Sequence, residues 1–145
     1  MANVAVPVQD EREVDWAVEQ AVKLFRFHQA RIHLLNVQHP LPRHVSRFFS
    51  GADLQEFHQE SGMRVLQPAI RKLTEAEVAF KVHLLVGHEA ETIVHFAEEY
   101  GCTRIVMEDK PEGLLSALGL GAVNSQVSHL LSARNLSVAM GAVQI

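Results

Sequence analysis

The sequence predicts an α/β domain built on a doubly wound, five-stranded parallel sheet with helices on both faces. Short apolar runs alternate along the chain with longer segments whose apolar residues recur at helical spacing. The runs are almost entirely apolar, as in strands that are covered on both faces. The chain has 145 residues, the usual size of one domain, so residues 1–145 are expected to form a single domain.

The expected strands are short and rich in Val, Ile, Leu and Ala. A helix between each consecutive pair gives the order β-α-β-α-β-α-β-α-β, and right-handed crossovers then favour a doubly wound sheet. The strands are expected at residues 4–8, 32–37, 82–86, 104–107 and 136–143.

Four helices are expected between these strands. Asp10, followed three residues later by Glu13, is typical of a helix start, because a side-chain acceptor can cap the first turn. The second helix contains Pro68, which is expected to kink it, and a further weak point at Ser61 and Gly62. The first helix carries an apolar stripe over residues 14–25, and the others are expected at residues 53–77, 89–100 and 122–133.

Composition excludes several classes of protein. Apolar residues make up 48% and charged residues 21%, and the net charge is −4, so no basic face for nucleic acid is expected. No apolar run is long enough for membrane insertion, and no signal peptide is expected. The single cysteine, Cys102, cannot form an internal disulfide. A cytoplasmic protein is therefore expected.

Five segments, in the same order and with similar spacing, resemble those of the universal stress protein family. They are two apolar strands, a strand–Gly–helix joint, the strand before the family's phosphate loop and the end of that loop. The segments are residues 4–8, 30–37, 86–93, 103–107 and 121–124. The resemblance implies a sheet in the order 3-2-1-4-5 and a homodimer joined through the last strands. It also implies a stress-response role, with ATP or AMP bound by some members and a regulatory or protective function in others.

The chain departs from the motif of the ATP-binding members of that family. Their motif is Gly, two residues, Gly, nine residues, then Gly followed by Ser or Thr. Here Glu108 and Pro111 replace the first two glycines, Gly121 keeps the third, and Ala122 replaces the hydroxyl residue. The family's acid at the end of the first strand falls on Gln9, although Asp10 follows directly.

These replacements oppose phosphate binding. Pro111 has no N–H to donate, and Ala122 lacks a hydroxyl. Glu108 places a negative charge beside the phosphates, and like charges about 5 Å apart repel by roughly 3 kcal/mol at an effective dielectric of about 20. We therefore expect no cofactor, with ATP or AMP at an altered loop as the alternative. The residual nucleotide or anion site would comprise Gln9, Val37, Met107, Gly119, Gly121, Ala122 and Val123.

The last expected strand should lie at a sheet edge if the family's strand order holds. An apolar edge strand favours pairing with another chain. We therefore expect a homodimer through this strand, with the chain's own loops covering the edge as the alternative. The expected interface residues are Leu136, Val138, Met140 and Ala142.

Histidine, cysteine and aromatic side chains are further candidates for sites. His33 and His83 lie in similar stretches of two strands and share a face if those strands are neighbours in register; packed imidazoles are favoured over a metal site. Cys102 is expected to be a partly buried, unreactive thiol. The aromatic residues Phe48 and Phe49, with Phe57, form either core or a surface for another protein.

Three function classes follow from these observations. A dimeric regulatory or stress-response module that acts through partner contacts is favoured. An adenine-nucleotide sensor is the alternative. An enzyme is not expected, because no nucleophile motif and no convergent acid–base pair is visible.

Overall fold

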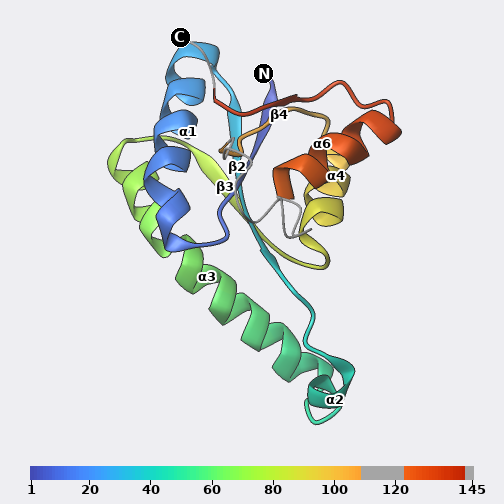
Figure 1. Cartoon of the computed structure of the whole chain (residues 1–145). Helices are drawn as coiled ribbons and strands as arrows, with labels where there is room; N and C mark the ends of the chain where they lie inside the picture. The colour runs from blue at the N-terminus through green and yellow to red at the C-terminus, as the bar shows by residue number, and fades with distance from the viewer. Residues whose placement is uncertain (109–122, 143–145) are drawn as a thin grey trace.

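The computed structural model, which describes residues 1–108 and 123–142, has a five-stranded parallel sheet in the order β3-β2-β1-β4-β5. The predicted architecture and strand order are confirmed. Figure 1 shows the sheet between two layers of helices. The strands are β1 (Asn3–Pro7), β2 (Arg31–Gln38), β3 (Phe80–Val86), β4 (Cys102–Ile105) and β5 (Ala139–Met140).

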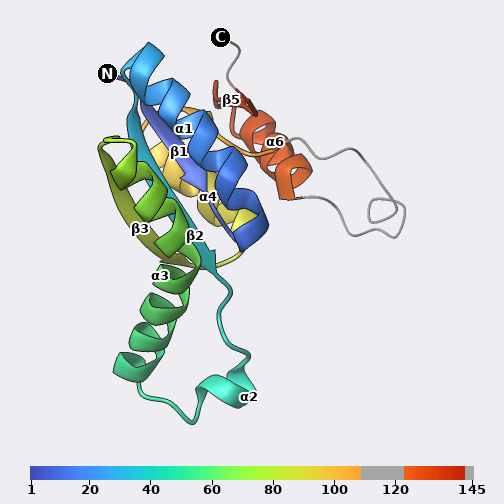
Figure 2. The same cartoon turned by 90° about the vertical axis from the view of Figure 1, so that its left-hand side faces the viewer.

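In the described part of the chain, two helices cover each face of the sheet. Successive strand residues point to opposite sides, so each strand packs against both layers of helices. Val4, Val6 and Val8 pack with α1 and α3 in one buried cluster. Ala5, on the opposite face, packs with α4 and α6 in a second cluster. Figure 2 shows α1 and α3 in front of the sheet and α4 behind it. The helices are α1 (Val14–His28), α3 (Gly51–Glu75), α4 (Glu89–Glu99) and α6 (Val123–Ala133).

The start of the first helical segment agrees with the predicted cap. The Asp10 side chain accepts a hydrogen bond from the Arg12 backbone N–H at 2.8 Å. It caps the short 3₁₀ helix η1 (Glu11–Glu13), which leads directly into α1. The capped turn fixes where the chain leaves β1, at the carboxyl end of the sheet.

The long helix α3 continues as one element through Gly62 and Pro68. A Cβ at position 62 would lie 2.8 Å from Cδ2 of Leu84 and 3.1 Å from Oδ1 of Asn36. Glycine therefore lets α3 approach β2 and β3 closely, so Gly62 is a packing residue as well as a weak helix former.

The segment between β2 and α3 contains a short helix that the sequence did not indicate. This helix, α2 (Arg43–Ser46), and the first half of α3 project away from the sheet (Figure 1). We call residues 39–58 the arm. None of the helices in the described part of the chain is both long and apolar enough to cross a membrane.

The last strand is much shorter than expected. β5 has only two residues, Ala139 and Met140, and Gly141 then adopts a φ of +88° that ends the extended conformation. The Arg104 guanidinium donates to the Gly141 carbonyl at 3.3 Å and holds this turn against β4.

Candidate functional site

The carboxyl ends of β1 and β2 meet at one edge of the sheet, beside the junction with β4. In open parallel sheets, ligands bind outside the carboxyl ends of strands, where neighbouring connections leave in opposite directions. Here β1 pairs with β2 on one side and with β4 on the other. Gln9 and Met107 follow the two central strands, so they border this region.

Gln9 joins the ends of β1 and β2 through its side chain. Its Nε2 donates to the Val37 carbonyl oxygen at 2.6 Å, and its Oε1 accepts from the Val37 backbone N–H at 2.8 Å. The preceding ladder bond runs from the Val8 N–H to the Leu35 carbonyl, also at 2.8 Å. The carboxamide therefore continues the parallel ladder for one more residue and uses both backbone polar groups of Val37.

The Gln9 backbone is fixed as well. Its N–H donates to Oε2 of Glu13 at 2.8 Å, in the turn that begins α1. Because the backbone and the side chain are both bonded, the orientation of the carboxamide toward Val37 is determined by the local fold.

A second pair of carboxamides lies beside the first. Buried Asn36 donates from Nδ2 to the Val8 carbonyl at 2.9 Å, and its Oδ1 accepts from Nε2 of Gln38 at 2.7 Å. Three carboxamides, of Gln9, Asn36 and Gln38, thus close the carboxyl end of the β1–β2 pair. We call them the amide lock.

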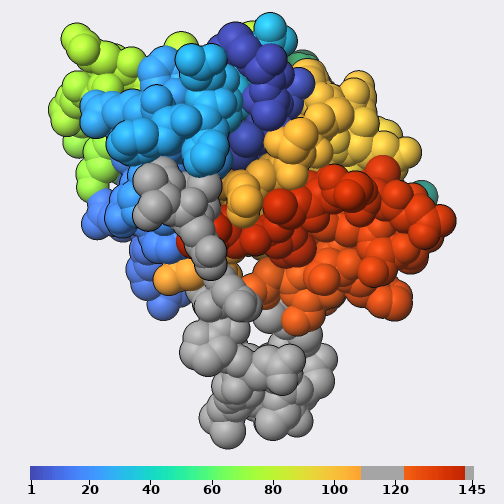
Figure 3. Space-filling view, turned by 90° about the horizontal axis from the view of Figure 1, so that it is seen from above, coloured from blue at the N-terminus to red at the C-terminus, as the bar shows by residue number. Residues whose placement is uncertain are grey.

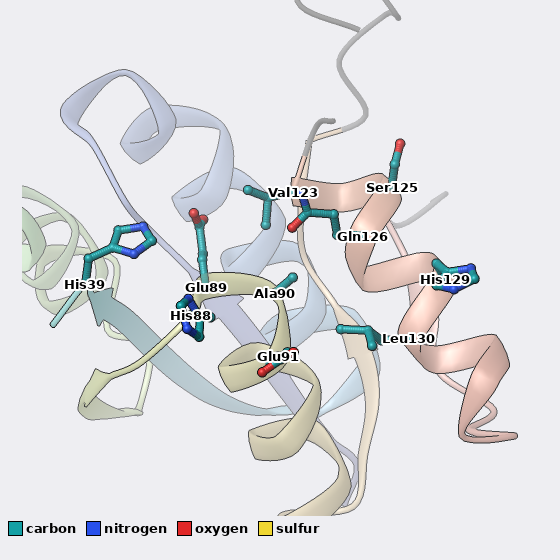
Figure 4. Close-up of a pocket in the computed structure, with 10 residues that line it drawn as sticks. All are labelled: His39, His88, Glu89, Ala90, Glu91, Val123, Ser125, Gln126, His129 and Leu130. Atoms are coloured by element: carbon teal, nitrogen blue, oxygen red, sulfur yellow. The ribbon is translucent and has the colours of Figure 1, made fainter. Parts of the chain in front are cut away.

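A pocket of about 790 Å³ opens next to the lock, between the end of β2, the start of α4 and α6. Figure 4 shows His39 on one side, the first turn of α4 in the middle and α6 on the other side. The first turn of α4 contributes the acidic side chains of Glu89 and Glu91, and Ala90, Val123 and Leu130 contribute apolar surface. The lining residues are His39, His88, Glu89, Ala90, Glu91, Val123, Ser125, Gln126, His129 and Leu130.

The residues of the pocket do not converge as metal ligands do. Among residues 1–108 and 123–142, no three or more His, Cys, Asp or Glu side chains are grouped so that they could hold a metal ion. The carboxylates of Glu89 and Glu91 in the first turn of α4 oppose the favourable field that a helix N-terminus offers to anions.

The structure describes four of the seven predicted nucleotide residues. Gln9 and Val37 are in direct contact, and Val123 lines the pocket. Met107 is half-buried against the α4–α6 cluster. Gly119, Gly121 and Ala122, like Pro111, lie outside the described residues.

Glu108 is exposed at the carboxyl end of β4. Its backbone carbonyl accepts a hydrogen bond from Nδ2 of Asn124 at 3.1 Å, which connects it to the first turn of α6. The acid at the motif's first position therefore lies close to the start of this helix.

The expected dimer residues surround the short last strand. Leu136, Val138 and Met140 are half-buried and pack against the α4–α6 cluster, whereas Ala142 is exposed. Three of the four side chains therefore contribute to the chain's own core, and β5 itself forms one edge of the sheet.

The histidine pair and the cysteine agree with their predicted settings. His33 and His83 lie on the same face of neighbouring strands, with Nδ1 of His33 2.9 Å from Nε2 of His83. Cys102 is buried, and burial raises the pKa of its thiol to about 11, so the thiol stays protonated and unreactive at neutral pH.

The aromatic residues of the arm are on the surface. Phe48 is 73% exposed, Phe49 49% and Phe57 47%. The guanidinium of Arg47 lies 4.9 Å from the centre of the Phe48 ring. Of the two predicted alternatives, core or surface, the structure supports the surface.

Sequence reasoning missed the two contacts between Gln9 and Val37, and it missed the pocket. A glutamine directly after a buried strand was a usable signal, since its carboxamide has the donor and acceptor of a peptide group. Nothing in the sequence indicated that His39 and His88 would lie on one pocket wall, because this depends on the relative lengths of β2 and β3.

The fold is shared with solved structures of low sequence identity. A universal stress family protein from Burkholderia pseudomallei is 22% identical and has a TM-score of 0.65, with 98% of this chain and 96% of that chain covered. A universal stress protein from Lactobacillus plantarum is 18% identical and has a TM-score of 0.67, with 99% and 97% covered. A third, from Archaeoglobus fulgidus, is 18% identical with a TM-score of 0.62, and 97% and 93% are covered.

No curated protein matches the chain. The sequence model of the Universal stress protein family, in contrast, matches residues 1–133. That match covers every strand except β5, together with α1 to α4 and the whole of α6. The chain therefore belongs to the universal stress protein family.

Proposed function

We propose that this chain is a regulatory stress-response protein that acts through contacts with other proteins, without ATP binding or catalysis. The observation that carries this proposal is the pair of hydrogen bonds from the Gln9 carboxamide to both backbone polar groups of Val37. The exposed acid Glu108 supports it.

The Gln9 carboxamide competes directly with an adenine base. Adenine presents an amino donor next to a ring-nitrogen acceptor, and this edge pairs well with the N–H and C=O of one strand residue. The Gln9 side chain presents the same donor and acceptor to Val37 at 2.6 and 2.8 Å. A base that displaced it would have to replace two hydrogen bonds worth about 1 kcal/mol each before gaining any affinity.

The phosphates would meet a second obstacle. Glu108 lies next to the start of α6, held there through Asn124. A phosphate about 5 Å from its carboxylate would be repelled by roughly 3 kcal/mol per unit charge at an effective dielectric of about 20. Each such repulsion corresponds to a roughly hundredfold loss of affinity for the nucleotide.

An adenine-nucleotide sensor is the second candidate, and the pocket favours it. Its volume of about 790 Å³ lies in the range of small-molecule sites, which is about 300–1,000 Å³. Similar solved structures include a universal stress protein in complex with cAMP, at 16% identity, and one from Arabidopsis thaliana with AMP bound, at 18% identity. In this candidate, Gln9 would swing away from Val37 when the nucleotide enters.

Calorimetric titration with MgATP separates the two candidates. We expect no saturable heat from the native protein at millimolar nucleotide. Gln9→Ala exposes the N–H and C=O of Val37, and weak binding in the millimolar range should then appear. Gln38→Ala is the matched control, because it removes a neighbouring carboxamide that donates to Asn36 and not to the backbone of Val37. A micromolar dissociation constant for the native protein would refute the proposal.

We further propose that two copies associate through β5. The support is its position at the sheet edge and the exposed Ala142 beside it. Light scattering at tens of micromolar should show a dimer for the native protein and a monomer for Ala142→Glu. Ala133→Glu, at an exposed position at the end of α6, should remain dimeric. A monomeric native protein would rule out this association.

The arm supports the partner-contact part of the proposal. Residues 39–52 carry Arg43 and Arg47 and no acid, and Phe48 and Phe49 are exposed beside them. Such a basic and aromatic surface suits an acidic, partly apolar segment of another protein.

A further inference from the structure

A pair of imidazoles connects the sheet edge to α4 at the opposite end of the sheet from the amide lock. Nδ1 of His33 lies 2.9 Å from Nε2 of His83, and Nε2 of His33 lies 3.0 Å from Oδ1 of Asn3. His33 is only 4% exposed, and His83 is half-buried. Figure 3 views the molecule from this end, where the first residues of the chain (dark blue) lie between α1 (light blue) and α4 (yellow).

The hydrogen-bond partners fix where the protons lie. Nδ2 of Asn3 donates to the Tyr100 carbonyl at 3.0 Å, so Oδ1 of Asn3 is the atom that faces His33 and it must accept. His33 therefore carries its proton on Nε2 and accepts at Nδ1. The bond between the rings then runs from the Nε2–H of His83 to Nδ1 of His33.

The rings lie against aromatic side chains of α4. The His83 ring centre is 4.7 Å from that of Phe96 and 5.3 Å from that of Tyr100, and the His33 ring is 5.6 and 5.3 Å from the same two. Phe96 and Tyr100 are themselves stacked at 4.3 Å. The two histidines thus form one of the contacts between strands β2 and β3 and the end of α4.

The charged groups around the pair are cationic. The positive charges of Arg31 on β2 and Lys81 on β3 both lower the pKa of His33, and Lys81 also lowers the pKa of His83. β1 contributes the neutral Asn3, and α4 contributes Phe96 and Tyr100.

Two carboxylates near the end of α4 are directed elsewhere. Glu98 pairs with Arg134, and Glu99 pairs with the exposed His95. A proton added to the imidazole pair is therefore repelled by positively charged side chains on both strands.

We propose that His33 and His83 form a two-proton site that releases the edge strand β3 and the end of α4 from each other at acidic pH. The first proton enters at Nδ1 of His83, and the bond between the rings survives, since Nε2 of His83 still donates. The second proton must enter at Nδ1 of His33. Two N–H groups then face each other across 2.9 Å, and the bond is replaced by repulsion between two cations.

β3 is suited to respond to this change. It is the outermost strand on its side of the sheet, so within residues 1–108 and 123–142 its one strand partner is β2. Its residues are mostly half-buried or exposed, and Val86 at its end is 50% exposed. Separation of the rings would uncover Phe96, which is 3% exposed, beside Tyr100, which is already 41% exposed. This inference rests on the proposed function: it would add an acid-dependent apolar surface to a protein that acts through contacts with other proteins.

Titration of the ring protons by NMR tests the proposal first. We expect the two imidazoles to titrate in two separated steps, with the second below the range of an isolated histidine, near 6.5. Independent single steps near 6.5 for His33 and His83 would overturn the proposal, and this measurement needs no variant.

Hydrogen exchange then tests the structural consequence. Between about pH 7 and about pH 5, protection factors of the β3 amides should fall about tenfold or more in the native protein, since the second proton replaces the hydrogen bond between the rings with repulsion. His83→Gln can still donate to Nδ1 of His33 but does not titrate, so its β3 protection should be independent of pH. His95→Gln is the control and should behave as the native protein. An equal pH dependence in His83→Gln, or none in the native protein, would refute the release of β3.

Discussion

The two ends of β2 are held by different chemistry. At the carboxyl end, carboxamides bond to backbone groups: Gln9 to Val37 and Asn36 to Val8, at 2.6–2.9 Å. At the amino end, His33 bonds to His83 and Asn3 at 2.9 and 3.0 Å. The bond lengths are alike, but carboxamides do not titrate between about pH 4 and 10 and imidazoles do. The hydrogen bonds at the carboxyl end of β2, beside the pocket, are therefore independent of pH, and those at its amino end, beside the end of α4, depend on pH.

The largest effect on stability is expected from the pH-independent end. Asn36→Ala removes both hydrogen bonds of a buried side chain and leaves the Val8 carbonyl without its donor. We expect a loss of about 2–3 kcal/mol in the free energy of unfolding. Urea denaturation should give the same loss at pH 7 and at pH 5.5. A loss that changes with pH would show that the two ends are coupled.

The next largest effect is expected in the pH dependence of the native protein's stability. Burial, followed by the neighbouring His83, Lys81 and Arg31, lowers the pKa of His33. Burial and Lys81 lower that of His83. The unfolded chain then binds protons before the folded one does.

This stability is fully present above the ordinary imidazole pKa of 6.5 and is lost as the pH falls through the lowered folded-state values. Urea midpoints should therefore fall from pH 7 to pH 5, and the fall should be smaller in His83→Gln. A urea midpoint that rises toward pH 5 would contradict the predicted loss of stability at lower pH.

A smaller loss of stability is expected for Gln9→Ala. Its two bonds to Val37 are partly exposed to water, which can replace the lost donor and acceptor. We expect a loss of about 1–2 kcal/mol, independent of pH, in the same urea titrations. A pH-dependent loss would show that Glu13, which accepts from the Gln9 backbone, contributes through its charge.

The smallest effect tests a region remote from both ends. Ser50 caps α3 in the arm by accepting from the Asp53 N–H at 3.1 Å. Ser50→Ala should cost about 0.5–1 kcal/mol, with no change in the titration of the His33 and His83 rings. A shift in either imidazole pKa would show that the arm and the histidine pair are linked.

Much of the fold followed from periodicity and end signals. The apolar runs and helical stripes predicted four helices within a few residues, because burial on one or both faces determines these patterns. β5 was overestimated, since Leu136 and Val138 are apolar for packing against α4 and α6 and not for strand pairing. The helix α2 was missed because residues 39–46, His-Pro-Leu-Pro-Arg-His-Val-Ser, have turn residues and no helical stripe.

The site was less predictable than the fold. The sequence assigned Gln9 and Val37 to the residual nucleotide site. Nothing in it specified that they form hydrogen bonds with each other, since this depends on where β1 and β2 end in space. The pairing of His33 with His83 could be anticipated from two similar strands. Its register could not: His33 lies opposite Lys81, and His83 lies opposite Leu35.

The most direct test of the account is the backbone amide resonance of Val37 during addition of MgATP. If the Gln9 carboxamide occupies both polar groups of Val37, this resonance and the side-chain amide of Gln9 should not move at millimolar nucleotide in the native protein. In Gln9→Ala, the Val37 resonance should begin to shift. A saturable shift in the native protein at micromolar MgATP would show that the crevice accepts adenine and would contradict the account.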